Sequence, residues 1–246
     1  MGQPEREWRA LTLLSEYAPG LAPDPVTADL VGDPPRVVMS RLIGTPLAAP
    51  VTAEQLIALA DAIRSVQEAI PAAVLADLPP RLGRPSELLR QLRARCDARP
   101  ALGSDPLVAQ AFHAAVGWLP EPRLTELFAA EVVPVFGLGD GNLANYLWDG
   151  SRVRLLDFEY SGRSDRAYEL AEVVEHVTAW VDDAVDVPAL LSCFDLTAAE
   201  QARLRNSRRL LALFWFLALL PDSPGHRRNP SGSLERQAAR LLALLG

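Results

Sequence analysis

Three oxygen-bearing side chains surround one short segment of the chain, Gly139–Glu159. Asp140 and Asn145 lie in a glycine-containing loop, and Asp157 follows the apolar run that ends this segment. The Asp-Gly pair that begins at Asp149 predicts a tight turn between two short strands, so that the chain folds back as a β-hairpin. Such a hairpin brings Asn145 and Asp157 to the same end and lets the three side chains meet.

Phosphoryl transfer uses this combination of side chains. One carboxylate orients the attacking hydroxyl, and hard oxygen ligands hold the Mg²⁺ that accompanies the nucleotide. Asp140 suits the first task, and Asn145 and Asp157 suit the second. The alternative is that Asp140, Asn142 and Asn145 only form turns and that Asp157 only ends a strand. The joint spacing favours the phosphotransfer site.

The motif D-x4-N, the hairpin, the tripeptide DFE and the segment DRAYELAEVVEH resemble the aminoglycoside phosphotransferase and choline/ethanolamine kinase family, which has a protein-kinase-like fold. The resemblance implies ATP as the phosphoryl donor and Mg²⁺ as its cofactor. It implies that Asp140 is the catalytic aspartate and that Asn145 and Asp157 are the magnesium ligands. Asp165 matches a structural aspartate that braces the catalytic loop. One departure is Leu138, which stands where the family commonly has a histidine.

The resemblance also covers the first residues. The segment EREWRALTLLSEYAPG resembles the third helix of the family, with Glu7 at the position of the glutamate that pairs with the phosphate-binding lysine. The segment RVVMSRL resembles the strand and hinge that hold the adenine, which implies nucleotide contacts at Met39, Ser40, Arg41 and Leu42. In the family, the strands that carry the phosphate loop and the lysine precede this helix.

The sequence contains no lysine, and the planar fork of arginine does not replace the compact ammonium group of lysine. Two explanations remain open, a truncated gene and a genuinely short protein. If catalysis requires the missing strands, the chain is a non-catalytic pseudokinase or a binding protein, which is the alternative to an active kinase. The retained Asp140, Asn145 and Asp157 favour the kinase.

The charge of the chain concerns the acceptor molecule. A formal net charge of −7 argues against a nucleic-acid partner and favours a cationic small molecule with a hydroxyl group, of aminoglycoside or amino-alcohol type. Six acidic residues are candidates for an acidic surface near the site: Glu169, Glu172, Glu175, Asp182, Asp183 and Asp186. The alternative is that they form a solvated helix face. The candidates for the acceptor site are Glu159, Tyr160, Glu175, His176 and Trp180. Trp180 would attract an amine through its ring face, and Glu159 would alternatively pair with Arg163 or Arg166.

Hydrophobic periodicity and turn signals predict a mostly helical chain with a small β region in the middle. The predicted helices are Glu5–Tyr17, Thr52–Ala69, Ser86–Arg95, Asp105–Trp118, Pro122–Ala130, Ala167–Trp180, Pro188–Phe194, Ala198–Leu220 and Leu234–Leu245. The predicted strands are Thr27–Val31, Arg36–Leu42, Val132–Phe136, Tyr146–Trp148 and Val153–Leu156, and PDSPGHRRNPSGS is a predicted loop. Together with the resemblance, this gives an α+β, protein-kinase-like fold. Residues 1–47 would be the remnant of a truncated nucleotide-binding N-lobe, and residues 48–246 a helical C-lobe with the catalytic loop and the acceptor site.

The remaining signals concern the compartment. Cys96 and Cys193 lack the spacing of metal ligands, which indicates free thiols in a reducing compartment. The first residues lack the apolar stretch of a secretory signal, and the apolar run Leu210–Leu220 is too short to span a bilayer, so it predicts a buried helix. We therefore expect a cytoplasmic protein with no membrane partner. The sequence leaves the oligomeric state and the identity of the acceptor open.

Overall fold

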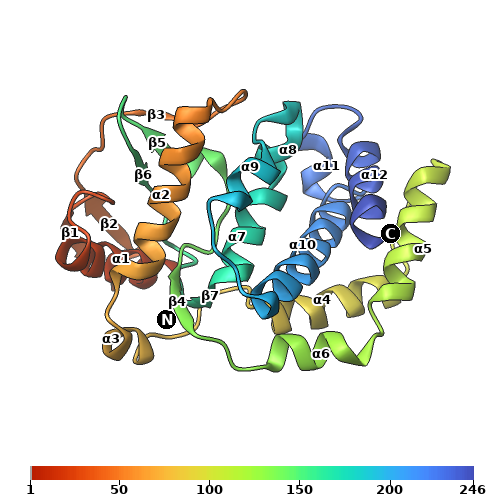
Figure 1. The fold of residues 1–246 in the computed structure, drawn as a ribbon, viewed down its shortest axis with the longest axis horizontal. Helices are drawn as coiled ribbons and strands as arrows, with labels where there is room; N and C mark the ends of the chain where they lie inside the picture. Colours follow the sequence, from red (N-terminus) through yellow and green to blue (C-terminus); the bar gives the residue numbers. More distant parts are fainter. Residues whose placement is uncertain (1) are drawn as a thin grey trace. The chain divides into compact units, whose positions relative to one another are not determined.

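The computed structural model describes residues 2–246, and the chain divides into two compact units. One unit contains Met1–Gly83 and Val132–Thr197, and the other contains Arg84–Glu131 and Ala198–Gly246. Helices dominate both units, and every strand assigned within the described residues belongs to the first unit (Figure 1). The predicted α+β class is confirmed.

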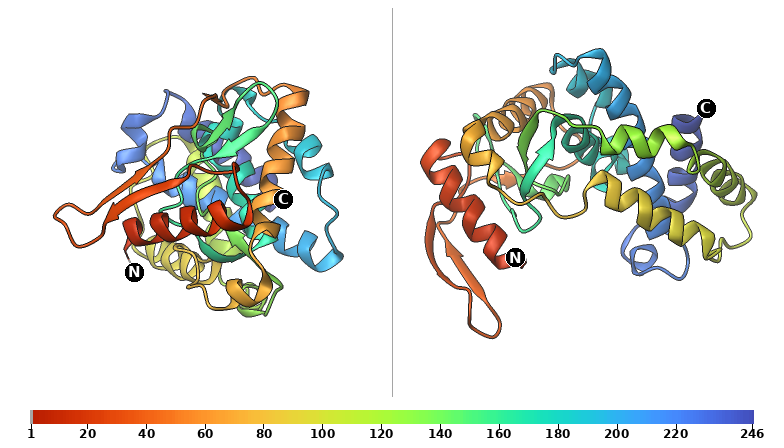
Figure 2. Two further views of the ribbon diagram at one scale, coloured as in Figure 1. Left: turned by 90° about the vertical axis from the view of Figure 1, so that its left-hand side faces the viewer. Right: turned by 90° about the horizontal axis from the view of Figure 1, so that it is seen from below.

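A helix and a β-hairpin begin the first unit. Its elements are α1 (Gln3–Tyr17), β1 (Pro25–Asp29) and β2 (Arg36–Met39). The two strands pair antiparallel and lie along α1, which buries Leu11 and Leu14 (Figure 2). The first strand begins and ends two residues earlier than predicted. The cause is a turn at Asp29, whose carboxylate accepts hydrogen bonds from the backbone N–H groups of Val31 and Gly32.

A second, three-stranded sheet contains the predicted hairpin. Its elements and the helix beside it are β3 (Thr45–Pro46), β5 (Tyr146–Trp148), β6 (Val153–Leu155) and α2 (Ala53–Ala69). The strands are antiparallel in the order β3-β5-β6, so the predicted hairpin is confirmed. Thr52 caps α2 by accepting a hydrogen bond from Gln55 N, and Leu59 and Ile63 of this helix are buried. The hairpin therefore rests on a well-capped core helix, α2, that also contacts β6.

The strand before the Asp140 loop pairs with a strand that was not predicted. The elements here are β4 (Pro134–Gly137), β7 (Gly162–Asp165), α7 (Arg166–Glu175) and α8 (Val177–Trp180). β7 has the sequence GRSD, which lacks the β-branched and aromatic residues typical of strands. The single helix predicted over Ala167–Trp180 is wrong, because the chain turns at His176 with a ψ angle of 141°. There the His176 ring accepts a hydrogen bond from Thr178 N and caps α8.

The second unit is helical throughout its described residues. Its helices are α4 (Pro85–Asp97), α5 (Pro106–Trp118), α6 (Pro122–Ala129), α10 (Ala198–Ala218), α11 (Pro224–Arg228) and α12 (Ser233–Leu245). α10 packs against α4 and α12, and its apolar run is buried as predicted. α11 lies in the segment predicted as a loop, with Pro224 at its first position. The short elements α3 (Ala72–Ala76), η1 (Leu143–Asn145), η2 (Val181–Asp183) and α9 (Val187–Ser192) complete the first unit.

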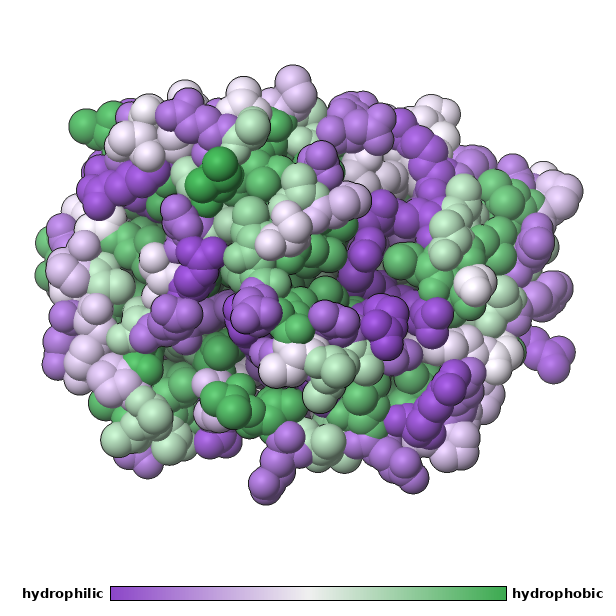
Figure 3. All heavy atoms as spheres, viewed as in Figure 1, coloured by the Kyte–Doolittle hydropathy of each residue, from purple (hydrophilic) through white to green (hydrophobic). Residues whose placement is uncertain are grey.

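Across residues 2–246, no helix combines the length and the apolar character that crossing a bilayer requires. Hydrophilic and hydrophobic residues are interspersed on the face drawn in Figure 3.

Candidate active site

The loop after β4 places Asp140 and Asn145 in direct contact. Asn145 Nδ2 donates a hydrogen bond of 3.1 Å to Asp140 Oδ2, and the backbone N–H of Asn142 donates to Asp140 Oδ1 at 2.9 Å. Asn145 ends η1, and its carbonyl oxygen accepts a hydrogen bond of 2.9 Å from Leu156 N on the returning side of the hairpin. Asp157 follows directly. The hairpin therefore brings these three residues together by backbone hydrogen bonds as well as by side-chain contacts.

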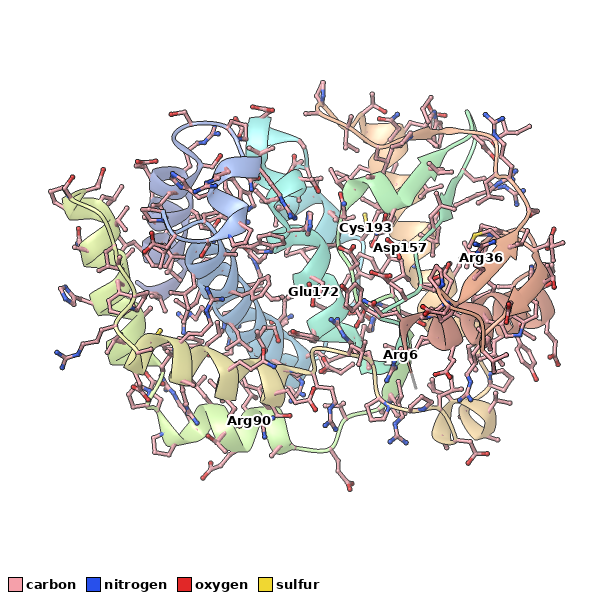
Figure 4. The ribbon with its side chains drawn as sticks, turned by 180° about the vertical axis from the view of Figure 1, so that it is seen from behind. Arg6, Arg36, Arg90, Asp157, Glu172 and Cys193 are labelled. Carbon is pink, nitrogen blue, oxygen red and sulfur yellow. The ribbon has the colours of Figure 1, made fainter. Side chains whose placement is uncertain are left out.

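Asp157 has an unusual backbone conformation. Its φ angle is +63°, in the left-handed region that residues other than glycine rarely adopt. Burial raises the pKa of its carboxyl group, and the charge of Asp140 raises it further. Figure 4 shows Asp157 beyond the end of β6. Strain and unfavourable charge at one residue are typical of functional sites, where a bound cation compensates for them.

Glu7 of α1 lies beside the same loop. It is 8% exposed, and its Oε2 accepts a hydrogen bond from the backbone N–H of Phe158. Burial raises the pKa of Glu7 to about 7, and the charges of Asp157 and Glu159 add to the effect of burial. These three acidic residues line one concave region of about 280 Å³ together with Gln3, Pro4, Pro35, Val37 and Met39.

The four predicted adenine contacts have different surroundings. Met39 ends β2 and lines the same concave region as Glu7 and Asp157. The backbone N–H of Ser40 donates to Asp24 O at 2.8 Å, so this N–H already has a partner within the protein. Arg41 is exposed and Leu42 is half-buried.

A buried arginine that sequence reasoning missed holds the catalytic loop. Arg81 is 4% exposed and donates to Gly139 O at 3.1 Å, to Glu169 Oε1 at 2.9 Å and to Glu172 Oε1 at 2.8 Å. Glu169 Oε2 in turn accepts a hydrogen bond from Gly139 N. Burial alone lowers the pKa of Arg81, but the two glutamates raise it more, so the guanidinium stays charged. The loop backbone is thus bound on both its N–H and its C=O side.

This arrangement corrects the interpretation of α7. Glu169 and Glu172 were expected to form an acidic surface or a solvated helix face, yet both contribute to a buried ion-pair cluster with Arg81. The signal in the sequence was two glutamates three positions apart among the apolar residues of α7. Such a pair on a buried helix face requires a cation from another part of the chain.

Glycines allow the loop to approach α7 and its neighbours. A Cβ atom on Gly137 would lie 2.4 Å from the Glu169 carboxyl group, and one on Gly141 would lie 2.1 Å from the backbone oxygen of Glu172. Gly139 has a φ angle of +84°, and its Cβ would lie 2.7 Å from Tyr160 Cβ. The spacing Gly-x-Gly-Asp-Gly is therefore a packing requirement of this loop.

A histidine does lie near Asp140, although Leu138 stands where the family commonly has one. His176 Nε2 is 3.8 Å from Asp140 Oδ1. Its Nδ1 accepts a hydrogen bond from Thr178 N, and Thr178 Oγ1 accepts one from Leu143 N in η1. Burial lowers the pKa of His176 to about 4, and the opposing effect of Asp140 is smaller. The ring is therefore neutral at pH 7, with its Nε2 side toward Asp140.

The other candidate residues are placed as follows. Glu159 lines the acidic concave region, and its carboxyl group shares a hydrogen bond with Tyr160, while Arg163 donates to Ala76 O. Asp165 caps α7 by accepting a hydrogen bond from Tyr168 N. Glu175 is fully buried, and Trp180 is half-buried at the end of α8.

The oxygen donors fit a magnesium ion held jointly by protein and nucleotide. Among the described residues, no group of three or more His, Cys, Asp or Glu side chains is arranged as a metal cluster. Mg²⁺ in nucleotide enzymes is usually bound by one or two carboxylates together with substrate phosphates and water. Asp157 would supply such a carboxylate, and Asn145, whose Nδ2 bonds to Asp140, would have its amide oxygen left for a second ligand bond.

Comparisons with known proteins agree with this geometry. Residues 2–204 match the family model described as the phosphotransferase enzyme family. No curated protein sequence matches the chain significantly.

Solved structures share the fold. A choline/ethanolamine kinase family protein from Mesorhizobium loti is 19% identical, with a TM-score of 0.68 and coverage of 98% of this chain and 80% of that chain. A choline kinase from Streptococcus pneumoniae is 15% identical, with a TM-score of 0.61 and coverage of 98% and 80%. A thermostable mutant of an aminoglycoside phosphotransferase, in a ternary complex with ADP and hygromycin B, is 14% identical, with a TM-score of 0.64 and coverage of 98% and 82%.

Proposed function

Because the chain belongs to the phosphotransferase enzyme family, we propose that it transfers the γ-phosphoryl group of ATP to a hydroxyl group of a small cationic molecule. The observation that carries the proposal is the contact of Asp140 with Asn145 at the end of a hairpin whose returning strand leads into Asp157. These residue types serve the positioning and charge neutralisation on which phosphoryl transfer depends.

In the proposed mechanism, Asp140 accepts the proton of the acceptor hydroxyl and directs the oxygen toward the γ-phosphorus. Its two oxygens are held by Asn142 N and Asn145 Nδ2, so the carboxylate has a fixed orientation before the acceptor binds. Asn145 and Asp157 would hold Mg²⁺, which neutralises the phosphate charge that develops during transfer.

The proposed site has a nucleotide side and an acceptor side, which we assign to different parts of the chain. We assign the nucleotide side to residues 1–47, with Glu7 and Met39 beside the acidic concave region and the segment Met39–Leu42 beside the adenine. The remaining residues, 48–246, carry the catalytic loop and the acceptor. Glu159, Tyr160, Glu175, His176 and Trp180 are the proposed acceptor contacts. Carboxylates and an aromatic ring favour an amine-bearing acceptor, such as an aminoglycoside or an amino alcohol.

The first test is calorimetric titration of ATP into the protein with Mg²⁺ and with a chelator. Because the chain has no lysine to anchor the phosphates, we expect ATP binding in the wild type to be weak or absent. Any binding that is measured should require Mg²⁺ and should lose this dependence in Asp157→Ala. Asp61→Ala is the matched control, because Asp61 is an exposed carboxylate of α2 that forms an ion pair with its helix neighbour Arg64. Unchanged Mg²⁺-dependent binding in Asp157→Ala would refute the assigned metal ligand.

The second test is phosphoryl transfer to a panel of aminoglycosides and amino alcohols. We expect Asp140→Asn to keep ATP binding and to lose at least about 100-fold in transfer rate, the usual contribution of a positioned general base. A variant that transfers at the full rate would refute the mechanism. Binding of ATP without transfer to any acceptor, in the wild type as well, would favour the non-catalytic alternative.

A further inference from the structure

A small cavity lies beside α1, within the first unit. Its polar lining consists of Arg6 and Arg9 of α1 and of Ser161 from the segment that leads into β7. The rest of the lining is Gly162 and apolar residues, and none of the described residues around the cavity is acidic. Its volume is about 10 Å³, which is room for about one water molecule or one monatomic ion. The lining therefore brings positive charge to the cavity and no negative charge.

Arg6 is a buried cation that no carboxylate neutralises. The residue is 8% exposed and lies near the start of α1 (Figure 4). Its Nη1 donates to the carbonyl oxygens of Pro80 and Ser161, at 2.9 Å in both cases. Across residues 2–246 it forms no ion pair, and the charge that acts on it is that of Arg9. Burial lowers the pKa of Arg6, and Arg9 lowers it further. Because a guanidinium stays charged in proteins, this buried charge remains uncompensated and costs stability.

Two buried donors at the cavity lack an acceptor. Arg6 Nε is shielded from solvent and has no hydrogen-bond partner among the described residues. Ser161 is 3% exposed, and its hydroxyl forms no hydrogen bond within the same part of the chain. Buried polar groups in native proteins nearly always have a partner in the protein, in ordered water or in a bound ion. The N–H of Arg6 and the O–H of Ser161 therefore require an acceptor inside the cavity.

We propose that this cavity is a binding site for one chloride ion, which accepts hydrogen bonds from Arg6 Nε and Ser161 Oγ and neutralises the charge of Arg6. A water molecule would also accept from both donors, but it would leave the charges of Arg6 and Arg9 uncompensated. Polyatomic anions such as phosphate and sulfate exceed the available volume. A monatomic, monovalent anion satisfies the donors, the charge and the volume together.

The ion would stabilise α1 in its place within the first unit. Arg6 joins α1 to the backbone at Pro80 and at Ser161, and a counter-ion removes the penalty for burying its charge there. Glu7, the next residue of α1, accepts a hydrogen bond from Phe158 N. The inference does not rest on the proposed function, because neither a nucleotide nor an acceptor takes part in it.

The first test is a crystal structure of the wild type grown in sodium bromide, with diffraction data collected at the bromine absorption edge. Bromide replaces chloride and gives an anomalous signal that water does not give. We expect one anomalous peak within hydrogen-bond distance of Arg6 Nε and Ser161 Oγ. A water molecule or an empty cavity at this position overturns the proposal, and this result needs no variant.

The second test is urea unfolding in sodium chloride and in sodium gluconate at equal ionic strength, because gluconate is too large for the cavity. A ligand that binds only the folded state stabilises it by mass action. Each tenfold rise in chloride above its dissociation constant should therefore lower the unfolding equilibrium constant tenfold, relative to gluconate. Equal unfolding curves in the two salts overturn the proposal. A bromide peak combined with equal curves means an adventitious ion only.

Variants connect the effect of chloride to the cavity. Ser161→Ala removes one donor and no charge, so we expect chloride to bind at least about tenfold more weakly. Arg6→Met removes the charge and should abolish the effect. The matched exchanges Ser86→Ala and Arg90→Met alter exposed residues of α4 and should keep it. If Arg6→Met does not fold, Ser161→Ala decides, and an effect of wild-type size in that variant overturns the proposal.

None of these measurements involves ATP or an acceptor. Loss of the chloride site would leave the phosphotransferase assignment standing. Failure of transfer in every acceptor assay would refute that assignment and leave chloride binding as an independent result.

Discussion

Glu7 is a buried carboxyl group beside two further carboxyl groups, those of Asp157 and Glu159. Its carboxyl group accepts a hydrogen bond from a backbone N–H, that of Phe158, which carries no full positive charge. At pH 8 all three groups would have to carry negative charge in a partly dry region, which costs free energy. A bound metal ion would supply positive charge to this region.

The charge of Glu7 should make the protein less stable as the pH rises. Because the pKa of Glu7 is about 7 in the folded protein and 4.5 in the unfolded chain, the folded state holds the proton more tightly. Its contribution to stability is full below pH 4.5 and is lost as the pH rises through 7. We expect Glu7→Gln to be more stable than the wild type at pH 8, by at most about 3 kcal/mol, and equal to it at pH 4. Urea unfolding across this pH range in a chelating buffer measures the difference.

Asp61→Asn is the control for the Glu7 experiment. It removes one negative charge at an exposed site and should leave the slope of stability against pH unchanged between pH 5 and 7. A Glu7→Gln variant with the same slope as the wild type would contradict the shift assigned to Glu7.

A second prediction at the residue scale concerns the tautomer and the pKa of His176. We expect NMR to show a neutral ring protonated at Nε2, with a pKa of about 4, because Thr178 N donates to Nδ1 and the ring is buried. Asp140→Asn should lower this pKa further, since the Asp140 charge raises it. A ring that titrates near 6.5 would contradict the effect of burial assigned to His176.

At the residue scale, the sequence predicted contacts between residues that are close in the sequence better than contacts between residues that are far apart in it. Asp140, Asn145 and Asp157 are joined by a short hairpin, so turn chemistry alone was enough to bring them together. Arg81 is far from Glu169 in the sequence, and no periodicity indicates which arginine would pair with two buried glutamates. The nearness of His176 to Asp140 likewise depends on the helix break at that residue.

At the scale of elements, the contact between the catalytic loop and α7 decides where Asp140 lies. Gly141 lies so close to α7 that the neighbouring atoms are backbone, which cannot rotate away as a side chain can. The loop and the helix are therefore fixed to each other at this point, one residue after Asp140.

We expect Gly141→Ala to lower the free energy of unfolding by about 2 to 3 kcal/mol, as overpacked sites do. Its Cβ would lie 2.1 Å from the backbone oxygen of Glu172. Gly117→Ala is the matched exchange, because no atom lies within 4 Å of the added Cβ in α5, and it should raise stability by about 0.5 kcal/mol. Chemical denaturation of both variants checks the pair. Equal stability of Gly141→Ala and the wild type would mean that the loop is free to move away from α7.

Elements with strong local signals were predicted, and those set by their neighbours were not. The Asp149-Gly150 turn and the Thr52 cap each have a local chemical signature, and both the hairpin and α2 are present. β7 is a strand because it pairs with β4, and its own sequence gives no such indication. α7 and α8 are separate because the His176 ring accepts the hydrogen bond of Thr178 N, which in a continuous helix would go to a backbone carbonyl group. Hydrophobic periodicity cannot show this competition.

At the scale of the whole molecule, nucleotide binding should be seen as a pH-dependent gain in thermal stability. Burial raises the pKa values of Glu7, Asp157 and Glu159, so protons compete with a cation for this region at low pH. We expect Mg²⁺ with ATP to raise the melting temperature more at pH 8 than at pH 5. Differential scanning fluorimetry measures this, with Asp157→Ala as the variant that should show no increment at either pH.

The fold of the whole chain was predictable only with the help of the resemblance to a known family. Helix periodicity located most of the helices, including the buried α10, but it gives no information on how they pack. The solved structures share this fold at identities of only 14 to 19%, and packed cores tolerate many apolar exchanges.

The glycines at positions 137, 139 and 141 have a consequence for how this protein can diversify. A Cβ atom at each of them would lie within 2.7 Å of a neighbouring atom, so larger residues at these positions are expected to disturb the loop. The residues around them, Leu138 and Asp140, are fixed by the buried core and by the chemistry. If the proposed function holds, variation in the acceptor is therefore expected to involve other elements, such as the segment from His176 to Asp183, rather than this loop.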